Sequence, residues 1–255
     1  MLIGKITQRI NVTYSKQLSY AGRLQVVNAV LFSIYSFCGN DFILPQSVVK
    51  GVDRLCREYL WGTKEEMRKV ALVAWEKVCC PKNMGGLNIK GCREWNIASV
   101  GKLIWQLALN KESLWVRWVH GVYMKTNPDI WTHSPPLDSS WYWRKLNSVK
   151  EGMREWFSQG RYILNITGEY SINSSYIALM GRQQKMKVAD LIWSAVAQPK
   201  HRFIGWLATL GKMLTKDRMI GMSIQVDNVN CILCNVDAME TQEHLFVQCE
   251  WTRAV

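Results

Sequence analysis

Apolar residues recur every three or four positions along much of the N-terminal half of the chain. Over residues 18–37 this spacing predicts a helix with one apolar stripe, made of Leu18, Leu24, Val27, Leu31, Ile34 and Tyr35. A second helix is expected over Gln46–Trp61, after Pro45 and before a charged turn that begins at Gly62. Its apolar residues share one face, whereas its cationic residues lie on another.

The same spacing predicts more helices further along the chain. We expect one from Glu94 to about Lys111, a Trp-rich one over Ser113–Val122, and one or two short ones within 141–161. A small hairpin is expected over 162–172, turning at Thr167-Gly168. Helices should follow over 171–180, 189–196 and 203–214, the last two separated by Pro199-Lys200-His201. The expected fold is therefore mainly α, with a helical region followed by a small α+β region that contains one short hairpin.

Prolines at 128, 135 and 136 mark a loop or linker in the middle of the chain. They divide it into a basic helical region at 1–126, a Trp-rich linker region at 127–160, and a third region at 161–255. With 255 residues and 48% hydrophobic content, the chain is large and apolar enough to form a packed core. Among its 13 tryptophans we expect core residues where apolar neighbours surround them, with base stacking as the alternative, as at Trp61, Trp75, Trp95, Trp105 and Trp206.

The net charge of +12 is concentrated at the N-terminal end, because residues 1–126 hold 18 Lys and Arg against 8 Asp and Glu. Residues 191–255, by contrast, hold 6 of each. A basic excess on helices attracts polyanions and indicates a phosphate-backbone surface, although a solvated basic face gives the same pattern. The candidate phosphate contacts are Lys50, Arg54, Arg57, Lys64, Arg68 and Lys69.

Four potential metal ligands lie close together near the C-terminus. Cys231, Cys234, His244 and Cys249 are spaced C-x2-C-x9-H-x4-C, which is typical of a closed, structural zinc site. The surrounding segment from residue 226 is too short and too polar to fold on its own core, so a bound Zn²⁺ would supply the missing stability. The alternative is that these four residues are scattered in space.

No secretory signal opens the chain, so we expect a nuclear or cytoplasmic protein that is not secreted. The remaining cysteines are then expected to be reduced thiols that serve as packing residues. The longest apolar run, Leu24 to Cys38, is interrupted by Gln25 and Asn28 and is too short to cross a bilayer. It predicts a buried helix and no membrane span.

The segments LSYAGRLQVVNAVL at 18–31, VAWEKVCCPK at 73–82 and GEYSINSSY at 168–176 are among several that together resemble a known family, the plant LINE-type (non-LTR) retrotransposon reverse transcriptases, in their C-terminal part. The first is LSYAGRLQVVNAVL at 18–31, which is similar to the thumb helix that follows the polymerase palm. Further similar segments, in the family's order, are FILP at 42–45, YLWG at 59–62, VAWEKVCCPK at 73–82 and GGLNI at 85–89. GEYSINSSY at 168–176, FIGWLA at 203–208 and the Cys231–Cys249 segment resemble the family's zinc-binding region.

The resemblance implies a thumb-like region followed by a reverse-transcriptase zinc-binding domain, with RNA or an RNA–DNA hybrid held through its phosphate backbone. A polymerase needs paired aspartates to hold two magnesium ions, and no two Asp residues are adjacent here. We therefore expect a non-catalytic remnant that binds nucleic acid through the basic helices and the zinc knuckle. A protein-interaction or structural module and a non-functional truncated copy are the alternatives. The oligomeric state, and an internal deletion within 154–168, remain open.

Overall fold

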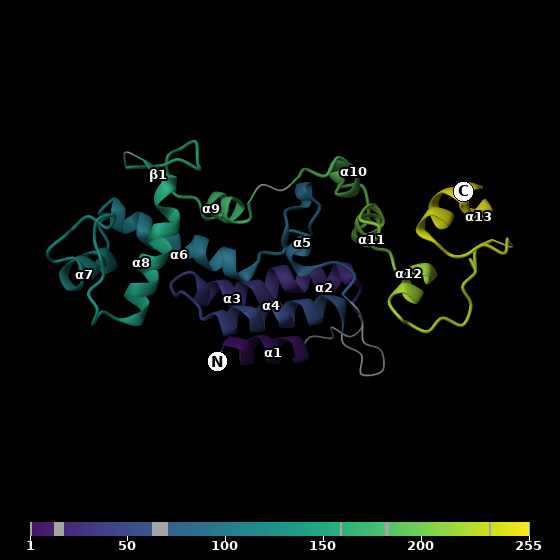
Figure 1. Ribbon diagram of the computed structural model, residues 1–255, viewed down its shortest axis with the longest axis horizontal. Helices are drawn as coiled ribbons and strands as arrows, with labels where there is room; N and C mark the ends of the chain where they lie inside the picture. Colours follow the sequence, from purple (N-terminus) through teal and green to yellow (C-terminus); the bar gives the residue numbers. More distant parts are fainter. Residues whose placement is uncertain are drawn as a thin grey trace.

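The computed structural model describes residues 2–12, 18–62, 71–158, 160–181, 184–234 and 236–254. Their fold is mainly α, and they contain one small antiparallel sheet, β1 (Phe157–Ser158) paired with β2 (Arg161–Tyr162). The molecule is elongated, with the C-terminus at one end and the helices around residues 114–153 at the other (Figure 1). The predicted fold class is confirmed.

A layer of helices forms the N-terminal part, where α1 (Leu2–Val12), α3 (Phe32–Gly39) and α4 (Gln46–Trp61) lie side by side (Figure 1). α2 (Tyr20–Val26), the π-helical turn η2 (Val27–Leu31) and α3 form one continuous helix. Ser19 caps its start, since its Oγ accepts a hydrogen bond from the Gly22 amide at 3.3 Å. The predicted apolar stripe is confirmed where Val27, Leu31 and Tyr35 are fully buried.

α4 has the predicted bounds and the predicted buried face. Pro45 precedes its first turn, and Gly62, with a φ of 82°, ends it. Val49, Val52 and Leu60 point into a first hydrophobic core that also contains residues of α1, η2 and α3. The cationic side chains on the other face of α4 remain exposed.

α5 (Trp75–Cys79) and the start of α6 (Cys92–Ala108) add residues to the first core, and the 3₁₀ turn η3 (Lys82–Met84) lies between these two helices. Asn96 of α6 joins α6 to the end of α3, because its Nδ2 donates to the carbonyls of Gly39 at 2.6 Å and Phe42 at 2.7 Å. Its Oδ1 accepts from the Leu44 amide at 2.9 Å. The buried amide is thus fully used in holding the two helices together.

A second core lies around the C-terminal half of α6, with α7 (Leu114–Val122), α8 (Trp141–Met153) and the 3₁₀ turn η4 (Arg154–Trp156). Lys150 is 3% exposed in this part of the molecule. Its Nζ donates to the carbonyls of Ile130 at 3.0 Å and His133 at 2.8 Å, and lies 3.1 Å from a carboxylate oxygen of Glu151. This lysine therefore fixes the 127–140 segment against α8.

The chain then returns to the first core through α9 (Ile172–Leu179), α10 (Ala189–Ile192) and α11 (Pro199–Thr209). α9 packs along α6, while Phe203 and Trp206 of α11 are buried among residues of the first core. α12 (Lys216–Gly221), the π turn η5 (His244–Gln248) and α13 (Glu250–Arg253) follow at the C-terminal end of the molecule (Figure 1). The predicted three-region division of the chain stays a prediction.

Three expectations for the C-terminal half are wrong. The hairpin lies at 157–162 rather than 162–172: Gly168 does turn, with a φ of 73°, but the residues beside it form no ladder. Residues 199–201 do not separate two helices, because Pro199 occupies the first turn of α11, where its missing N–H costs nothing. α10 ends at Ile192, four residues before the predicted end.

Within the described residues one helical stretch, Tyr20–Gly39, is long and apolar enough to cross a membrane by length and composition alone. Its buried residues pack into the first core, as those of a core helix do.

Candidate metal centre

Cys231, Cys234, His244 and Cys249 converge at the C-terminal end of the molecule. One ligand atom from each, three sulfurs and one imidazole nitrogen, lie within 4.8 Å of one another. Zinc–sulfur bonds of about 2.3 Å in a tetrahedron place the ligand atoms about 3.7 Å apart, so small movements suffice for all four to reach one ion. Among the described residues this is the one group of three or more His, Cys, Asp or Glu with such geometry.

A short turn presents the first two sulfurs. Asn230 and Met239 form an isolated antiparallel bridge, and the Cys231 amide donates to the carbonyl of Ala238 at 2.8 Å. Inside this turn the Leu233 amide donates to the Cys231 sulfur at 3.4 Å. The backbone therefore holds Cys231 and Cys234 on the same side of the turn, as their spacing predicts.

The imidazole comes from η5. The amide of His244 donates to the Thr241 Oγ at 3.0 Å, which caps the start of this turn, and His244 is 5% exposed. Its Nε2 lies 3.3 Å from the sulfur of Cys234. The Cys249 amide donates to the His244 carbonyl at 2.7 Å, and this π-type bond brings the fourth ligand back toward the first three.

Cys249 is fully buried and stands directly before the first turn of α13. The backbone N–H of Thr252, helped by that of Trp251, lowers the pKa of the Cys249 thiol below its ordinary value. Amides at a helix start stabilise the thiolate, which is the form that binds a metal ion. The local backbone is thus suited to present a charged sulfur at this position.

Polar contacts fix the segment from residue 226 onward, which we call the knuckle, against the rest of the chain. Gln242 donates from Nε2 to the carbonyl of Ala208 at the end of α11, at 2.6 Å. Lys216 of α12 donates to the Asn230 carbonyl and lies 3.8 Å from a carboxylate oxygen of Glu240. No described residue of the knuckle belongs to either hydrophobic core, which agrees with a segment whose stability depends on a metal.

The candidate phosphate contacts are placed only in part. Lys50, Arg54 and Arg57 are exposed on one face of α4, and Arg54 Nε lies 3.9 Å from a carboxylate oxygen of Glu58. The other three, Lys64, Arg68 and Lys69, lie outside the described residues.

The other cysteines have the character expected of packing residues. Cys56, Cys79, Cys80 and Cys92 are buried free thiols, and Cys38 is half-buried. Burial raises the pKa of the Cys56 thiol to about 12 and that of Cys92 well above its ordinary value. Such thiols remain protonated at neutral pH and are poor nucleophiles and poor metal ligands.

The comparison with known families agrees with this geometry. Residues 170–255 match the family described as zinc-binding in reverse transcriptase. This part of the chain is similar to the zinc-binding domain of reverse transcriptases. The match begins just before α9 and includes all four residues of the Cys₃His cluster, and no polymerase palm domain is found beside it.

A relative from Arabidopsis thaliana, named as a candidate ribonuclease H protein, is 39% identical over 114 residues. The aligned part is 45% of this chain and 18% of the relative, so the chain spans less than a fifth of that protein's length. Both findings confirm the resemblance to the C-terminal region of a retrotransposon-derived reverse transcriptase.

Proposed function

We propose that the Cys₃His cluster holds one structural Zn²⁺ ion. Three thiolates and one imidazole fill the four positions of a tetrahedron, so the ion would have no open position for a substrate or an activated water. When bound, the ion supplies folding energy rather than chemistry, on the order of 10–16 kcal/mol for small zinc-binding peptides at neutral pH. The four residues would hold the turn that contains Cys231 and Cys234 against the segment that contains His244 and Cys249.

We propose that the chain as a whole is a non-catalytic, nucleic-acid-binding remnant of a LINE-type reverse transcriptase. The observation that carries this proposal is the placement of Lys50, Arg54 and Arg57 at i, i+4 and i+7 on the solvent face of α4. Side chains with this spacing project from one side of a helix and can neutralise several phosphates of one backbone. The partner would be RNA or an RNA–DNA hybrid.

The charge of the knuckle supports a bracing role for it rather than a phosphate-binding one. Residues 226–255 carry five Asp and Glu against one Arg, a net charge of −4, and a Zn²⁺ ion with three thiolates adds −1. This segment would repel a phosphate backbone. We therefore expect the basic helices, and not the knuckle, to bind nucleic acid.

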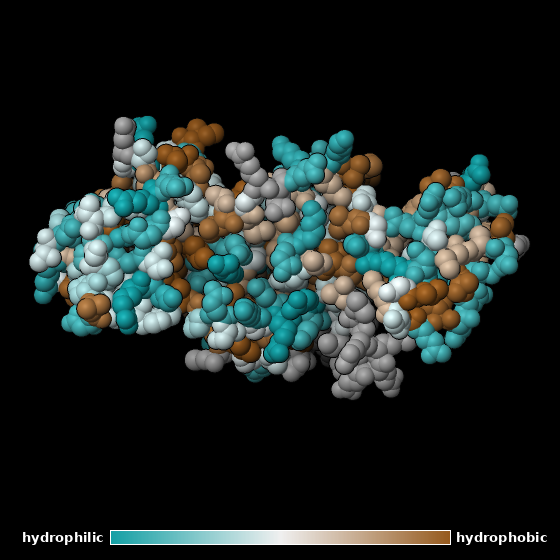
Figure 2. All heavy atoms as spheres, in the orientation of Figure 1, coloured by the Kyte–Doolittle hydropathy of each residue, from teal (hydrophilic) through white to brown (hydrophobic). Residues whose placement is uncertain are grey.

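A protein-interaction module is the second candidate, and a specific observation favours it. Ile232, Phe246, Val247 and Trp251 of the knuckle are 77%, 55%, 63% and 53% exposed. Figure 2 shows apolar atoms gathered at the C-terminal end of the molecule, beside polar ones. Apolar side chains grouped on a surface in this way are typical of protein contacts.

The test is the binding of a labelled RNA–DNA hybrid to the full chain across a salt series. Affinity should fall steeply with salt, and the triple variant Lys50→Ala, Arg54→Ala, Arg57→Ala should have a slope smaller by roughly 3. Arg144→Ala with Lys145→Ala, which removes two exposed cations of α8, is the control. Binding that is independent of salt, or unchanged in the triple variant, would contradict the proposal.

A further inference from the structure

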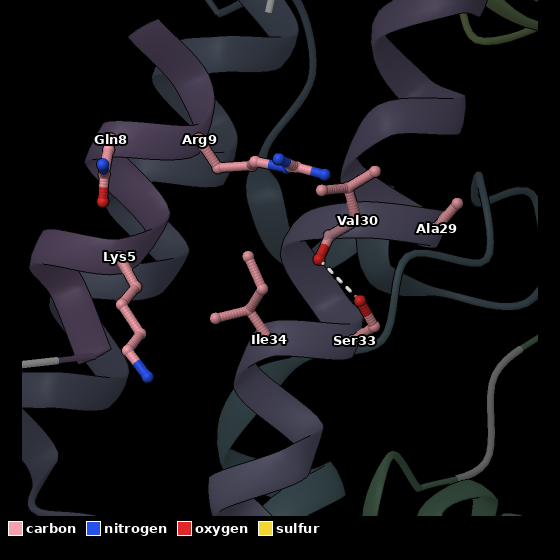
Figure 3. A pocket seen from close by; sticks show the side chains of 7 residues that line it. All are labelled: Lys5, Gln8, Arg9, Ala29, Val30, Ser33 and Ile34. Carbon is pink, nitrogen blue, oxygen red and sulfur yellow. Dashed lines mark hydrogen bonds between the residues drawn. The ribbon is translucent and has the colours of Figure 1, made fainter. Parts of the chain in front are cut away.

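A groove runs between α1 and the helix that contains η2 and the start of α3. Its volume is about 520 Å³, and Lys5, Gln8 and Arg9 form the α1 wall. Ala29, Ser33 and Ile34 belong to the opposite wall. Figure 3 shows the Arg9 side chain extending from α1 toward Val30, with Ile34 between the two helices.

The groove is open because of the residues and the backbone of its second wall. Ala29 and Ser33 are small and exposed, so they leave space that larger side chains would fill. The Ser33 Oγ donates to the Val30 carbonyl at 2.8 Å, the bond drawn in Figure 3, and so remains on its own helix. Ala29 and Val30 also lie within η2, and π turns of this kind occur often at binding sites.

The electrostatics of the groove favour an anion. Residues 1–40 contain four Lys and Arg and no Asp or Glu, so neither wall carries a carboxylate. α4, which packs against α1, contributes two acids: Asp53, which is partly buried, and Glu58, which is paired with Arg54. Lys5 and Arg9 are one helical turn apart, about 6 Å along α1, so their charges act on the same part of the groove.

α1, which forms one wall of the groove, also packs against α4. A Cβ added at Gly51, the residue after Lys50, would lie 2.8 Å from the Cδ1 of Ile3 on α1. This close approach places the start of α4 directly against α1. α1 therefore contributes one wall of the groove and also packs against the helix that carries Lys50, Arg54 and Arg57.

We propose that this groove is a second binding site for a nucleic-acid strand, in which Lys5 and Arg9 bind a backbone phosphate. The Gln8 amide would offer further polar contacts, while the attached sugar would lie on the apolar surface of Ala29 and Ile34. The inference rests on the proposed nucleic-acid function and assigns a contact that α4 alone does not provide. Its ligand is a phosphate within a strand, not the free anion.

Two variants test it by different means. The double variant Lys5→Ala, Arg9→Ala removes the charges, whereas Ala29→Leu with Ser33→Leu fills the groove and leaves the charge unchanged. Both sites of the second variant are exposed, so the helix should fold normally, which circular dichroism checks. Lys111→Ala with Arg117→Ala, two exposed cations near and on α7, is the matched control.

Binding of a labelled RNA–DNA hybrid to the full chain is the measurement, repeated with inorganic phosphate as competitor. We expect the charge variant to bind about tenfold more weakly, with a salt slope smaller by roughly 2, and the control to bind as the wild type does. The groove-filling variant should weaken binding without changing the number of exposed cations. Millimolar phosphate should not displace the hybrid.

The outcomes separate the two proposals. Failure of the wild type to bind the hybrid would remove the proposed function, and this inference with it. Normal wild-type binding with no loss in the charge variant or in the groove-filling variant would overturn the groove alone and leave the role of α4 standing. Displacement by free phosphate at the same concentration as by an unlabelled hybrid would overturn the assignment to a strand.

Discussion

Trp206 of α11 donates a hydrogen bond from its indole Nε1 to the carbonyl of Gly85 at 2.9 Å, across 121 residues of sequence. The Tyr176 hydroxyl similarly accepts from the Gly91 amide at 3.0 Å. The helices of the region that matches the zinc-binding family therefore pack against the segment between α5 and α6. The described residues of the knuckle, in contrast, belong to neither hydrophobic core.

Replacing Trp206 should destabilise the whole fold. Trp206→Phe leaves the Gly85 carbonyl without its partner and removes volume from a side chain that is 0% exposed. We expect a loss of about 1–3 kcal/mol in the free energy of unfolding, measured by urea denaturation. Trp118→Phe, at a side chain that is 54% exposed, should change it little. Equal effects of the two substitutions would refute this role of Trp206.

The buried Lys150 should be important for the second core. Lys150→Met keeps most of the side-chain volume but leaves the carbonyls of Ile130 and His133 without their donor. We expect a loss of about 1–3 kcal/mol in unfolding free energy. Lys145→Met, on an exposed face of the same helix, is the control and should be close to neutral. An unchanged urea midpoint for Lys150→Met would show that these two hydrogen bonds contribute nothing net.

The carboxyl of Asp53 should make stability depend on pH. Burial raises its pKa, against hydrogen bonds with Cys92 that lower it, and its Oδ1 is buried without a hydrogen-bond partner. A raised pKa means that the folded state binds the proton more tightly. This favourable contribution is present below the unfolded pKa of about 3.9 and is lost as the pH rises through the folded value.

Asp53→Asn should therefore stabilise the protein at pH 7, and the difference from the wild type should shrink as the pH falls toward 4. Urea midpoints measured across this range test the prediction, with Asp138→Asn, at an exposed carboxylate, as the control. If Asp53→Asn is less stable than the wild type at pH 7, the carboxylate is better satisfied than its buried oxygen indicates.

The long amphipathic elements could be predicted from the sequence because local periodicity and breakers determine them. α4 begins and ends where Pro45 and Gly62 place it, and its buried face follows the apolar spacing. The convergence of Cys231 with His244 could likewise be predicted from spacing, because a tight turn and a helical turn leave few other arrangements.

The remaining features depend on contacts that no local pattern encodes. β1 and β2 have two residues each, too few for any alternation, and their pairing follows from the turn at Gly160, which has a φ of 72°. The π turn at 27–31 and the groove beside it require α1 to pack against the helix that contains η2. Lys5 and Arg9, which we propose as phosphate contacts, cannot be singled out from the sequence for this reason, although the absence of acids over residues 1–40 is a usable signal.

The most direct test of the account is the zinc content of the purified full chain by elemental analysis. We expect one zinc ion per chain in the wild type and in Cys38→Ser, which changes a cysteine outside the cluster, and loss of the ion in Cys231→Ser and His244→Ala. The body of the molecule should stay folded in those two variants while the knuckle becomes sensitive to protease. A wild type without zinc, or the same zinc content in all four proteins, would contradict the account.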